Sequence, residues 1–409
     1  MFLAHTVQRF QQIWRGPALA IVVNGQRHRV GRGEPAAEVV IHKPAILPRL
    51  WLSPSLTFGD AYMRGDIEVR GPLMPVLHGF YLTAPALAAR WPGRALAWWR
   101  RGWSRVPRRQ AIANAEHHYD IGNAFYRLWL DESMTYSCAC FLRETDDLAT
   151  AQWQKLELLC RKARLRPGQR LLDIGCGWGS LLLHAARHHD VHVTGVTPAA
   201  EQAGYIRDEA RRLGLGEQVR VICGDWRDVT GRYDRIISVG MFEHVGVKQY
   251  RAFLDRWRAL LVEGGLSVLH TIGRMSPQPP DPWIRRHIFP GGYLPTLAQL
   301  ASHAGAAGLD VLDVENLRRH YSLTLRGWSE NFDRVREQVG QSHGQRFARM
   351  WWLYLQGAEA AFRWGGLHLW QLVLARDADA PWPLDREVRL AEATRELSNR
   401  ATDEPAPVV

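Results

Sequence analysis

The sequence predicts an α/β protein in which a mostly parallel sheet carries helices on both faces, joined to a small α+β unit at the N-terminus. Two observations lead to this prediction. Between residues 111 and 315, short apolar runs alternate with helical patterns, as expected when each strand is followed by a crossover helix. The first 110 residues instead show closely spaced short strands, turns and short helices. We therefore expect three parts, at residues 1–110, 111–377 and 378–409.

The N-terminal part is expected to begin with a helix and to continue with a β-hairpin. Asn24-Gly25 stands between two strand-like runs, which is typical of a two-residue hairpin turn. The expected strands are 18–23, 26–30, 38–42 and 67–70, and the expected helices are 1–15, 44–52 and 55–63.

The central part supplies the parallel sheet. Its expected strands are 171–174, 191–196, 219–223, 235–239 and 266–271, with helices between them at 180–188, 199–213 and 248–260. Beyond residue 316 we expect long helices near 328–340 and 345–362 and a last strand at 367–374. The tail after Asp377 is rich in proline, alanine and charge, and is expected to be partly loose.

The positive charge of the chain is concentrated in its N-terminal part. The chain holds 52 Lys/Arg and 41 Asp/Glu, a net charge of +11, and residues 1–110 hold 16 of the former and 5 of the latter. The remainder is therefore neutral. A basic module beside a neutral one suggests an anionic partner, either nucleic acid or phospholipid headgroups.

The five cysteines are scattered and show no disulfide or zinc spacing, which favours a reducing cytosol and gives no metal site. We expect neither a signal peptide nor a membrane span, so any membrane contact is expected to be peripheral.

A glycine turn follows the first strand of the expected parallel sheet. The strand 171–174 ends in Gly175, Gly177 and Gly179, and Asp173 stands two residues before the first of them. The spacing is not that of the dinucleotide fingerprint, and the turn lacks the lysine and hydroxyl of a phosphate-binding loop. Glycines are required where a backbone turns tightly beside a ligand. A tight turn without a ligand is the alternative interpretation.

Polar residues after neighbouring strands favour a nucleoside ligand at this turn. Thr197 and Gln202 follow the second strand, where an acidic residue commonly holds a ribose. After the third, the side chain of Asp225 can accept from an adenine amine and Trp226 can flank the ring. The carboxyl ends of these strands face one crevice, which indicates an adenosine ligand bound without a pyrophosphate. S-adenosylmethionine fits this description.

Longer motifs keep their order between residues 117 and 374. They are His118–Asp120, Thr135–Ala139, Asp173–Gly179, Ser238–His244, Leu269–Gly273, Ile288–Gly292, His320-Tyr321 and Leu369–Gln371. Through them the chain resembles the cyclopropane-fatty-acyl-phospholipid synthases and the related mycolic acid cyclopropane synthases. The resemblance implies a Rossmann-like class I methyltransferase fold with a seven-stranded sheet, a lipid-binding N-terminal domain and a homodimer. Residues 1–110 match that N-terminal domain more weakly, mainly through Gly59–Met63.

The resemblance also implies a reaction. The methyl group of S-adenosylmethionine passes to a cis double bond of a phospholipid acyl chain, a base removes a proton, and a ring closes. In the family the base is a bicarbonate ion, whose ligands match Cys138, Glu243, His270, the backbone of Ile272, and Tyr321. The same motifs place Tyr136 and Ser137 beside the cofactor.

The chemistry of these residue types agrees with the implied roles, although each residue has a plainer interpretation. Tyrosine and histidine can donate to an oxyanion, and a glutamate can accept from its hydroxyl. Without their motifs, Cys138, His270 and Tyr321 would be taken as core residues and Glu243 as a helix cap. One position departs from the family, because Ala358 stands where the pattern has a cysteine. A thiolate mechanism at that position is therefore excluded.

The segment 87–109 has the composition of a helix that lies on a membrane surface. Its arginines fall on one helical face and tryptophans border them; the residues are Arg90, Arg94, Arg101, Arg105, Arg108, Trp91 and Trp98. We expect a cytoplasmic protein docked on the inner face of the membrane. A linker helix is the plainer interpretation, and nucleic acid is not favoured as a partner because no binding module is recognisable.

Three other functions remain open from the sequence. A relative could leave a methyl branch on a lipid, a vestigial fold could bind lipid without catalysis, and a basic module could serve a nucleic-acid methyltransferase.

Overall fold

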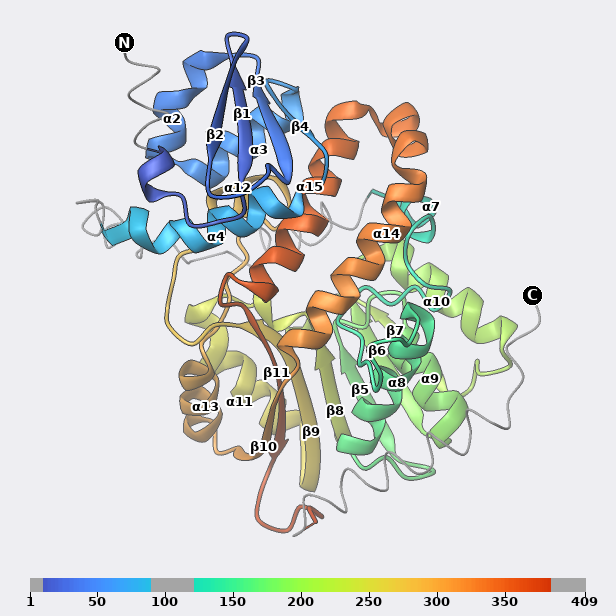
Figure 1. Cartoon of the computed structure of the whole chain (residues 1–409). Helices are drawn as coiled ribbons and strands as arrows, with labels where there is room; N and C mark the ends of the chain where they lie inside the picture. The colour runs from blue at the N-terminus through green and yellow to red at the C-terminus, as the bar shows by residue number, and fades with distance from the viewer. Residues whose placement is uncertain (1–9, 90–120, 384–409) are drawn as a thin grey trace. The chain divides into compact units, whose positions relative to one another are not determined.

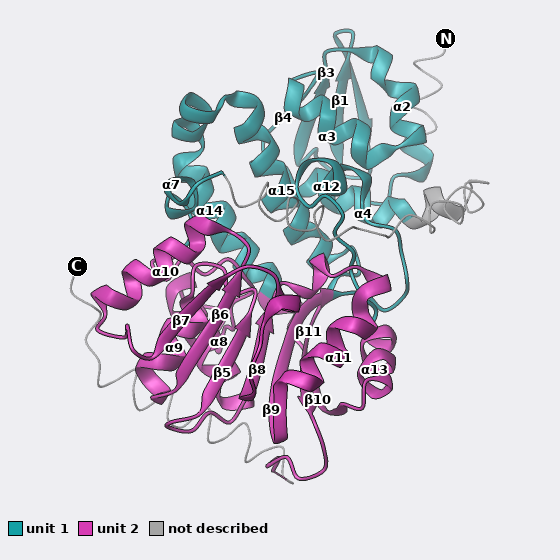
Figure 2. Ribbon diagram, turned by 180° about the vertical axis from the view of Figure 1, so that it is seen from behind, with its two compact units in different colours: residues 1–130, 273–296, 321–368 teal, residues 131–272, 297–320, 369–409 magenta. Residues whose placement is uncertain are grey.

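The computed structural model describes residues 10–89 and 121–383, which form two compact units (Figure 2). The first unit comprises residues 1–130, 273–296 and 321–368, and the second comprises residues 131–272, 297–320 and 369–409. The expected helix at 1–15 is described only from residue 10, and the expected surface helix at 87–109 only up to residue 89. The N-terminal sheet thus shares a unit with segments that follow it by more than 180 residues in the chain.

The second unit is built on a seven-stranded sheet in the order β10-β11-β9-β8-β5-β6-β7 (Figure 1). The strands are β5 (Arg170–Ile174), β6 (His192–Thr197), β7 (Val219–Cys223), β8 (Tyr233–Val239), β9 (Leu261–Gly273), β10 (Asp310–Asn316) and β11 (His368–Ala375). Strands β5 to β9 pair in parallel, whereas β10 and β11 pair antiparallel. The predicted fold class is confirmed.

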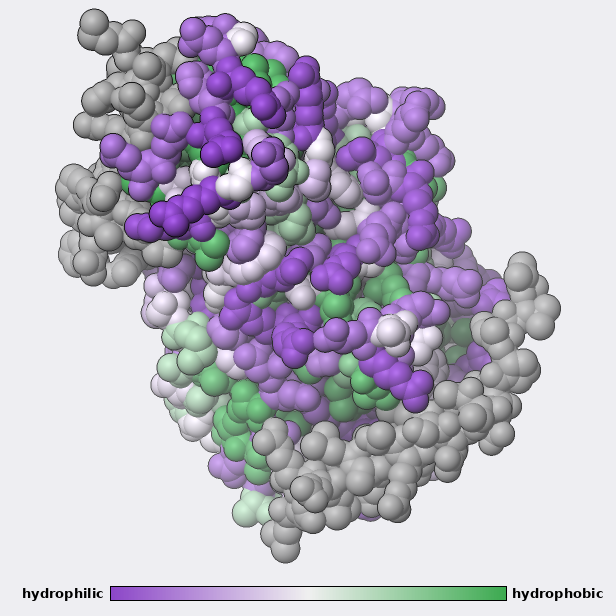
Figure 3. Space-filling model, in the orientation of Figure 1, coloured by the Kyte–Doolittle hydropathy of each residue, from purple (hydrophilic) through white to green (hydrophobic). Residues whose placement is uncertain are grey.

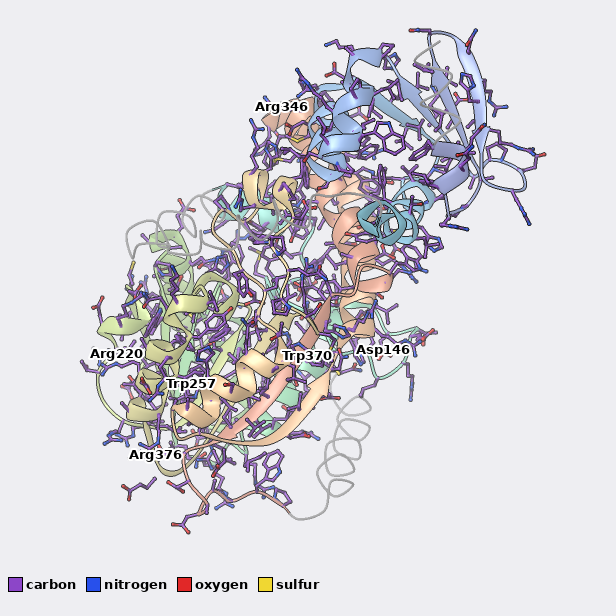
Figure 4. The ribbon with its side chains drawn as sticks, turned by 90° about the vertical axis from the view of Figure 1, so that its left-hand side faces the viewer. Asp146, Arg220, Trp257, Arg346, Trp370 and Arg376 are labelled. Carbon is purple, nitrogen blue, oxygen red and sulfur yellow. The ribbon has the colours of Figure 1, made fainter. Side chains whose placement is uncertain are left out.

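The helices of the second unit follow the strands as the alternating pattern predicts. They are α8 (Leu148–Lys162), α9 (Ser180–His189), α10 (Ala200–Arg212), α11 (Tyr250–Leu260) and α13 (Leu297–Ala306). Apolar residues of α8, α9 and α10 share one buried core with β5 and β6. Trp257, labelled in Figure 4, anchors α11 to the sheet, because its indole N–H donates to Ser267 Oγ at 2.7 Å on β9. Because β5 to β9 run parallel, their carboxyl ends lie at one edge of the sheet.

The first unit contains a four-stranded sheet in the order β2-β1-β3-β4. Its strands are β1 (Leu19–Val23), β2 (Gln26–Val30), β3 (Ala37–Ile41) and β4 (Ile67–Arg70). Asn24 and Gly25 both have positive φ, at 50° and 74°, which is the backbone of the predicted hairpin turn. The face of this sheet region seen in Figure 3 is mainly hydrophilic.

The helices of the first unit come from distant segments of the chain. They are α2 (Leu47–Leu52), α3 (Pro54–Arg64), α4 (Met74–Ala89), α7 (Asn123–Arg127), α12 (Pro282–His287), α14 (Arg318–His343) and α15 (Gln345–Arg363). Helix α3 packs against α12 and α15, and Gly59 lies so close to the indole of Trp283 that a Cβ there would come within 2.3 Å of it. The Gly59–Met63 motif therefore serves packing within this unit.

Several elements differ from the sequence predictions. The segment 44–52 is a 3-10 turn (η1, Pro44–Ile46) followed by α2, and α14 begins at Arg318 rather than near residue 328. Strand β10 and the helices α4, α8, α12 and α13 were not predicted. Strand β10 reads Asp-Val-Leu-Asp-Val-Glu-Asn, and such an acidic run is hard to distinguish from a loop. No helix among the described residues is long and apolar enough to span a membrane.

Candidate functional site

The glycine turn after β5 uses its three glycines in two different ways. Gly175 has φ 82°, and a Cβ there would lie 2.5 Å from the side chain of Met241. Gly179 has φ 85°, and a Cβ there would lie 2.7 Å from Ile206 on α10. Gly177 has φ 54°, but a Cβ there would meet no described heavy atom within 4 Å. The turn therefore offers open backbone at Gly177, while its neighbours fix the packing.

Asp173 lies directly before this turn and is buried with one free oxygen. The carboxylate is 1 % exposed, and its Oδ2 atom has no hydrogen-bond partner among the described residues. Burial raises the pKa of Asp173 to about 7, and the positive charge of Lys155 opposes this rise. A buried acceptor left open is expensive unless something absent from the structure pairs with it. Asp173 is therefore suited to hold a ligand.

Lys155 on α8 is a site residue that sequence analysis missed. Its side chain is 1 % exposed, and its Nζ donates to Ser137 Oγ at 2.9 Å. Burial lowers the pKa of Lys155 to about 8, and the charges of Asp131 and other neighbours oppose this shift. No motif marks this residue, because its importance comes from the segment 135–138, to which it is not adjacent in sequence. It ties the predicted cofactor residue Ser137 to α8.

A buried amide donor without a partner among the described residues follows β6, and an ion pair follows β7. Thr197 Oγ1 donates to Gln202 Oε1 at 2.7 Å, which leaves the buried Nε2 of Gln202 without a partner in the described part of the chain. Asp225 instead accepts from Arg227 through both oxygens, each at 2.8 Å. The guanidinium also lies over the ring of Trp226, 4.3 Å from its centroid. Sequence analysis missed Arg227, which pairs with the carboxylate that we expected an adenine to use, although the Oδ2 atom of Asp225 has a second lone pair to accept with.

Glu243 lies at the carboxyl end of β8, in the 3-10 turn Phe242–His244 (η4). Its Oε1 accepts from the backbone N–H of Ile272 at 2.6 Å, and its Oε2 is buried with no partner within the described ranges. Burial raises the pKa of Glu243 to about 7, even though the bond from Ile272 lowers it. The carboxyl group therefore gains or loses its proton near neutrality, which suits a group that shares a proton with a ligand.

His270 lies two residues before Ile272 on β9 and is held from one side. Its Nδ1 faces Gln371 Nε2 at 2.9 Å, and its Nε2 is buried without a partner among the residues described. Burial, together with the charges of Lys155 and Lys162, holds the pKa of His270 well below its usual value. The ring is therefore neutral, and its Nε2 is an open polar atom. Trp370, labelled in Figure 4, marks the strand β11 that carries Gln371.

Cys138 lies in a loop that contacts residues 317–320 of the same unit. The thiol is fully buried, and its Sγ donates to the carbonyl of Ala139 at 3.1 Å and lies 4.0 Å from that of Leu317. Three residues further on, the N–H of Phe141 donates to His320 Nδ1 at 3.1 Å. The loop is therefore attached to the residue that directly precedes Tyr321. Tyr136 and Ser137, on the same loop, are half-buried.

Tyr321 and Ala358 belong to the first unit. The ring of Tyr321 lies 4.5 Å from that of Phe362 on α15, centroid to centroid. Ala358 is half-buried on α15. Of the five predicted bicarbonate ligands, four therefore lie in the second unit, at Cys138, Glu243, His270 and Ile272.

A second cluster of ligating side chains lies between α8 and α9. Donor atoms of Cys160, His184 and His189 lie within 4.8 Å of one another. Both imidazole Nε2 atoms face Glu157 Oε2, at 3.1 and 3.0 Å. Because these nitrogens already share a carboxylate, the cluster is a satisfied polar network, and we assign no metal to it.

Comparison with known proteins relates this geometry to one family. The model of the mycolic acid cyclopropane synthetase family matches residues 107–372, and a domain of unknown function matches residues 7–89. A probable fatty acid methyltransferase of Pseudomonas putida is 35 % identical, covering 85 % of this chain and 90 % of the relative. A cyclopropane-fatty-acyl-phospholipid synthase of Escherichia coli is 34 % identical over the same shares.

A solved structure agrees with these sequence relatives. The crystal structure of a mycolic acid cyclopropane synthase complexed with SAH and CTAB superimposes with a TM-score of 0.62 at 33 % identity. The superposition covers 66 % of this chain and 99 % of the chain of the mycolic acid cyclopropane synthase. The protein is thus an enzyme of the methyltransferase class.

Proposed function

This chain belongs to the mycolic acid cyclopropane synthetase family, and from that premise we propose that it delivers a methylene from S-adenosylmethionine to the cis double bond of a phospholipid acyl chain. The family membership supports methylene transfer to a lipid. The phospholipid substrate and the cyclopropane product are the finer parts of the proposal, together with a bound bicarbonate as the base.

The edge of the parallel sheet fits the proposed cofactor. S-adenosylmethionine supplies an electrophilic methyl group when bound. The open backbone at Gly177 lets a ligand approach closely, and the buried free atoms Asp173 Oδ2 and Gln202 Nε2 are an acceptor and a donor for its polar groups. Trp226 is assigned to the adenine ring. Asp225, held by Arg227, is assigned to the adenine amine, because its Oδ2 atom has a second lone pair to accept with.

One observation carries the proposed base. Glu243 Oε2 and His270 Nε2 are both buried and both without a partner in the described residues, and Glu243 is anchored two residues from His270 on β9. Hydrogen carbonate has a hydroxyl to donate and oxyanion lone pairs to accept with, so it complements one acceptor and one donor. When bound, it supplies a basic oxygen for the proton of the delivered methyl group. Following the family resemblance, Cys138, the backbone of Ile272 and Tyr321 complete the proposed ligand set.

The roles of the two side chains follow from their surroundings. Glu243, whose pKa lies at about 7, accepts a hydrogen bond from the hydroxyl of the ligand when ionised, and so orients the basic oxygen of the ligand. The neutral His270 donates from Nε2 and adds no positive charge beside the proposed carbocation. Both residues act in a buried site, where a hydrogen bond to a charged group is stronger than in water.

The decisive experiment is an assay on vesicles of a cis-unsaturated phosphatidylglycerol with labelled S-adenosylmethionine. We expect a lipid product heavier by one methylene, and a rate that falls when bicarbonate is removed and returns when it is added. Acid methanolysis opens a ring but leaves a branch intact, so it identifies the product. A product formed equally fast without bicarbonate would overturn the proposed base but not the transfer.

A methyl-branched lipid is the second candidate product. It is favoured by one observation, that the relative from Pseudomonas putida is named a probable fatty acid methyltransferase. A branch requires loss of the cation by another route, with hydride supplied from elsewhere, whereas a ring needs only removal of a proton. Resistance of the product to acid methanolysis would favour this candidate.

We also propose that the enzyme works on the inner face of the membrane as a peripheral homodimer. The concentration of positive charge in residues 1–110 supports contact with an anionic surface. Sedimentation of the full chain at several concentrations tests the dimer. A shift of the melting temperature with S-adenosylmethionine tests the alternative of a lipid-binding protein without catalysis, which predicts no shift.

A further inference from the structure

The donor role of His270 depends on which of its ring nitrogens carries the proton. A neutral imidazole has one N–H and one acceptor nitrogen. Donation from Nε2 toward the proposed base therefore requires that Nδ1 act as the acceptor. Something on the Nδ1 side must enforce this choice, because burial alone does not distinguish the two tautomers.

Lys162 at the end of α8 fixes the orientation of the neighbouring amide. Its Nζ lies 2.6 Å from Gln371 Oε1, and both side chains are buried. An ammonium group has donors only, so it must face the oxygen of the amide and not its NH₂ group. The usual uncertainty between the two ends of a glutamine side chain is thereby removed.

The orientation of the amide then decides the tautomer of the histidine. With its oxygen on Lys162, Gln371 directs its NH₂ group toward His270, and Nε2 lies 2.9 Å from Nδ1. An amide N–H can only donate, so Nδ1 accepts and the ring proton stays on Nε2. The free Nε2 is therefore a donor, as the proposed base requires.

Lys162, Gln371 and His270 form a chain of hydrogen bonds, called the relay below. The relay is anchored at its outer end, at Lys162. Lys162 also pairs with Glu315 on β10, which balances the buried ammonium charge. The relay and its anchor come from α8, β10, β11 and β9, and Gln371 is 101 residues from His270 in sequence. No sequence motif connects these four side chains, which explains why sequence analysis assigned a role to His270 alone.

We propose that Lys162 and Gln371 are positioning residues that hold His270 as its Nε2–H tautomer and so give the active site its hydrogen-bond donor. The inference rests on the proposed function for its catalytic meaning. Its structural content, the position of one proton, can be measured in protein that holds neither lipid nor bicarbonate.

The substitution Gln371→Glu tests the relay with little change of shape. A carboxylate still pairs with Lys162 but can only accept, so the ring proton of His270 should move to Nδ1. We would record two-bond ¹H–¹⁵N spectra of the full-length protein labelled with ¹⁵N-histidine, and assign the signal by its loss in His270→Asn. We expect a protonated Nε2 in the wild type and a protonated Nδ1 in the variant. A wild-type signal with the proton on Nδ1 would overturn the proposal, as would one tautomer shared by both proteins.

Activity gives an independent readout with a characteristic pH dependence. We expect Gln371→Glu to lower kcat about 100-fold at pH 8, the usual effect of losing one donor to a reacting oxyanion. Binding of S-adenosylhomocysteine should stay within about twofold. The activity of the variant relative to the wild type at the same pH should rise as the pH falls, because the imidazolium form carries protons on both nitrogens. A purely structural defect would lower activity equally at every pH, and that result would refute the relay.

Two further variants control for charge and for folding. Gln169→Glu makes the same change in the same unit outside the relay. Its amide oxygen accepts from the backbone N–H of Arg166, and the variant should leave the His270 tautomer and kcat unchanged. Lys162→Arg retains donors toward Gln371 and should keep the Nε2–H signal, whereas Lys162→Met should lose this preference. If Lys162→Met does not fold, a changed tautomer in Lys162→Arg would still contradict the proposal.

Discussion

Glu243 combines a catalytic assignment with a cost in stability. A carboxyl group whose pKa is higher in the folded protein than in the unfolded chain stabilises the fold below its unfolded pKa. This contribution is lost as the pH rises through the pKa of the folded protein. For Glu243 that pKa is about 7, compared with 4.5 for an unperturbed glutamate. The same oxygen that suits Glu243 to bind a ligand, unpartnered among the described residues, therefore destabilises the ligand-free protein at alkaline pH, because the buried carboxylate is then charged.

The substitution Glu243→Gln should separate these two effects. The amide oxygen can still accept from Ile272, but the side chain no longer ionises. We expect activity to fall by about 10²- to 10⁴-fold, because a positioned acid–base group is lost. The free energy of unfolding at pH 8 should rise by about 3 kcal/mol, and the gain should vanish toward pH 4.5.

Urea unfolding of both proteins between pH 4.5 and 8 measures this difference. Glu263→Gln is the matched control, because that side chain is 89 % exposed and the variant should unfold like the wild type at every pH. Full activity of Glu243→Gln would refute its role in the proposed base site. If the wild type and Glu243→Gln had equal free energies of unfolding at pH 8, the ionised Glu243 would not destabilise the fold.

At the scale of elements, the β5–α9 turn separates binding from packing. We expect Gly177→Ala to weaken binding of S-adenosylhomocysteine at least tenfold while costing about 1–2 kcal/mol of stability, since a left-handed alanine is strained but meets no neighbour. Gly179→Ala should mainly destabilise, because its Cβ would press on Ile206. Calorimetric titration and thermal unfolding of the pair test this contrast. Unchanged affinity in Gly177→Ala would remove Gly177 from the cofactor site.

The contact between α8 and α9 should be sensitive to acid. Burial raises the pKa of Glu157. Hydrogen bonds from His184, His189 and Arg161 lower it by more than burial raises it, so the pKa lies below its usual value. Burial also lowers the pKa of His184. Both groups have a lower pKa in the folded protein, so both contribute stability that is present at alkaline pH and lost as the pH falls.

The substitution Glu157→Gln tests this polar cluster. We expect a loss of about 3 kcal/mol at pH 8, because buried partners lose their anion, and a weaker dependence of stability on pH below 6.5. Glu209→Gln breaks a pair with the exposed Arg212 and should cost less than about 1 kcal/mol. Urea unfolding at several pH values compares the two variants. Equal losses at pH 8 would show that burial does not strengthen the cluster.

The same elements show which parts of the fold a sequence reveals. Strands β5 to β8 were predicted within two residues, because each is a short apolar run that ends in a turn. Strand β10 was not predicted, because an edge strand with one antiparallel partner tolerates acidic residues and so lacks an apolar pattern. The motifs place Glu243 and His270 in the proposed site from the sequence alone, but Lys155 and Lys162 contact partners that only the fold brings near. Arg227, which pairs with Asp225, was missed for the same reason.

At the scale of the whole molecule, the charge asymmetry makes a prediction about the membrane. Three arginines of the basic segment, Arg90, Arg94 and Arg101, lie outside the described residues, so the argument rests on sequence. Each basic residue near an anionic surface adds about 1 kcal/mol to binding. We expect the triple change to alanine to weaken binding to anionic vesicles by at least tenfold, with little effect on neutral vesicles.

A matched control removes the same charge from the catalytic unit. Arg211, Arg212 and Arg251 have side chains that are 75 %, 67 % and 55 % exposed, and their change to alanine should leave vesicle binding nearly unchanged. Cosedimentation at low and high salt measures both triple variants, and activity on detergent-dispersed lipid confirms that the active sites are intact. If both variants lost the same affinity, net charge alone would account for binding. If neither lost any, the basic segment would not be the membrane contact, and its tryptophans would be better explained as a linker packed within the protein.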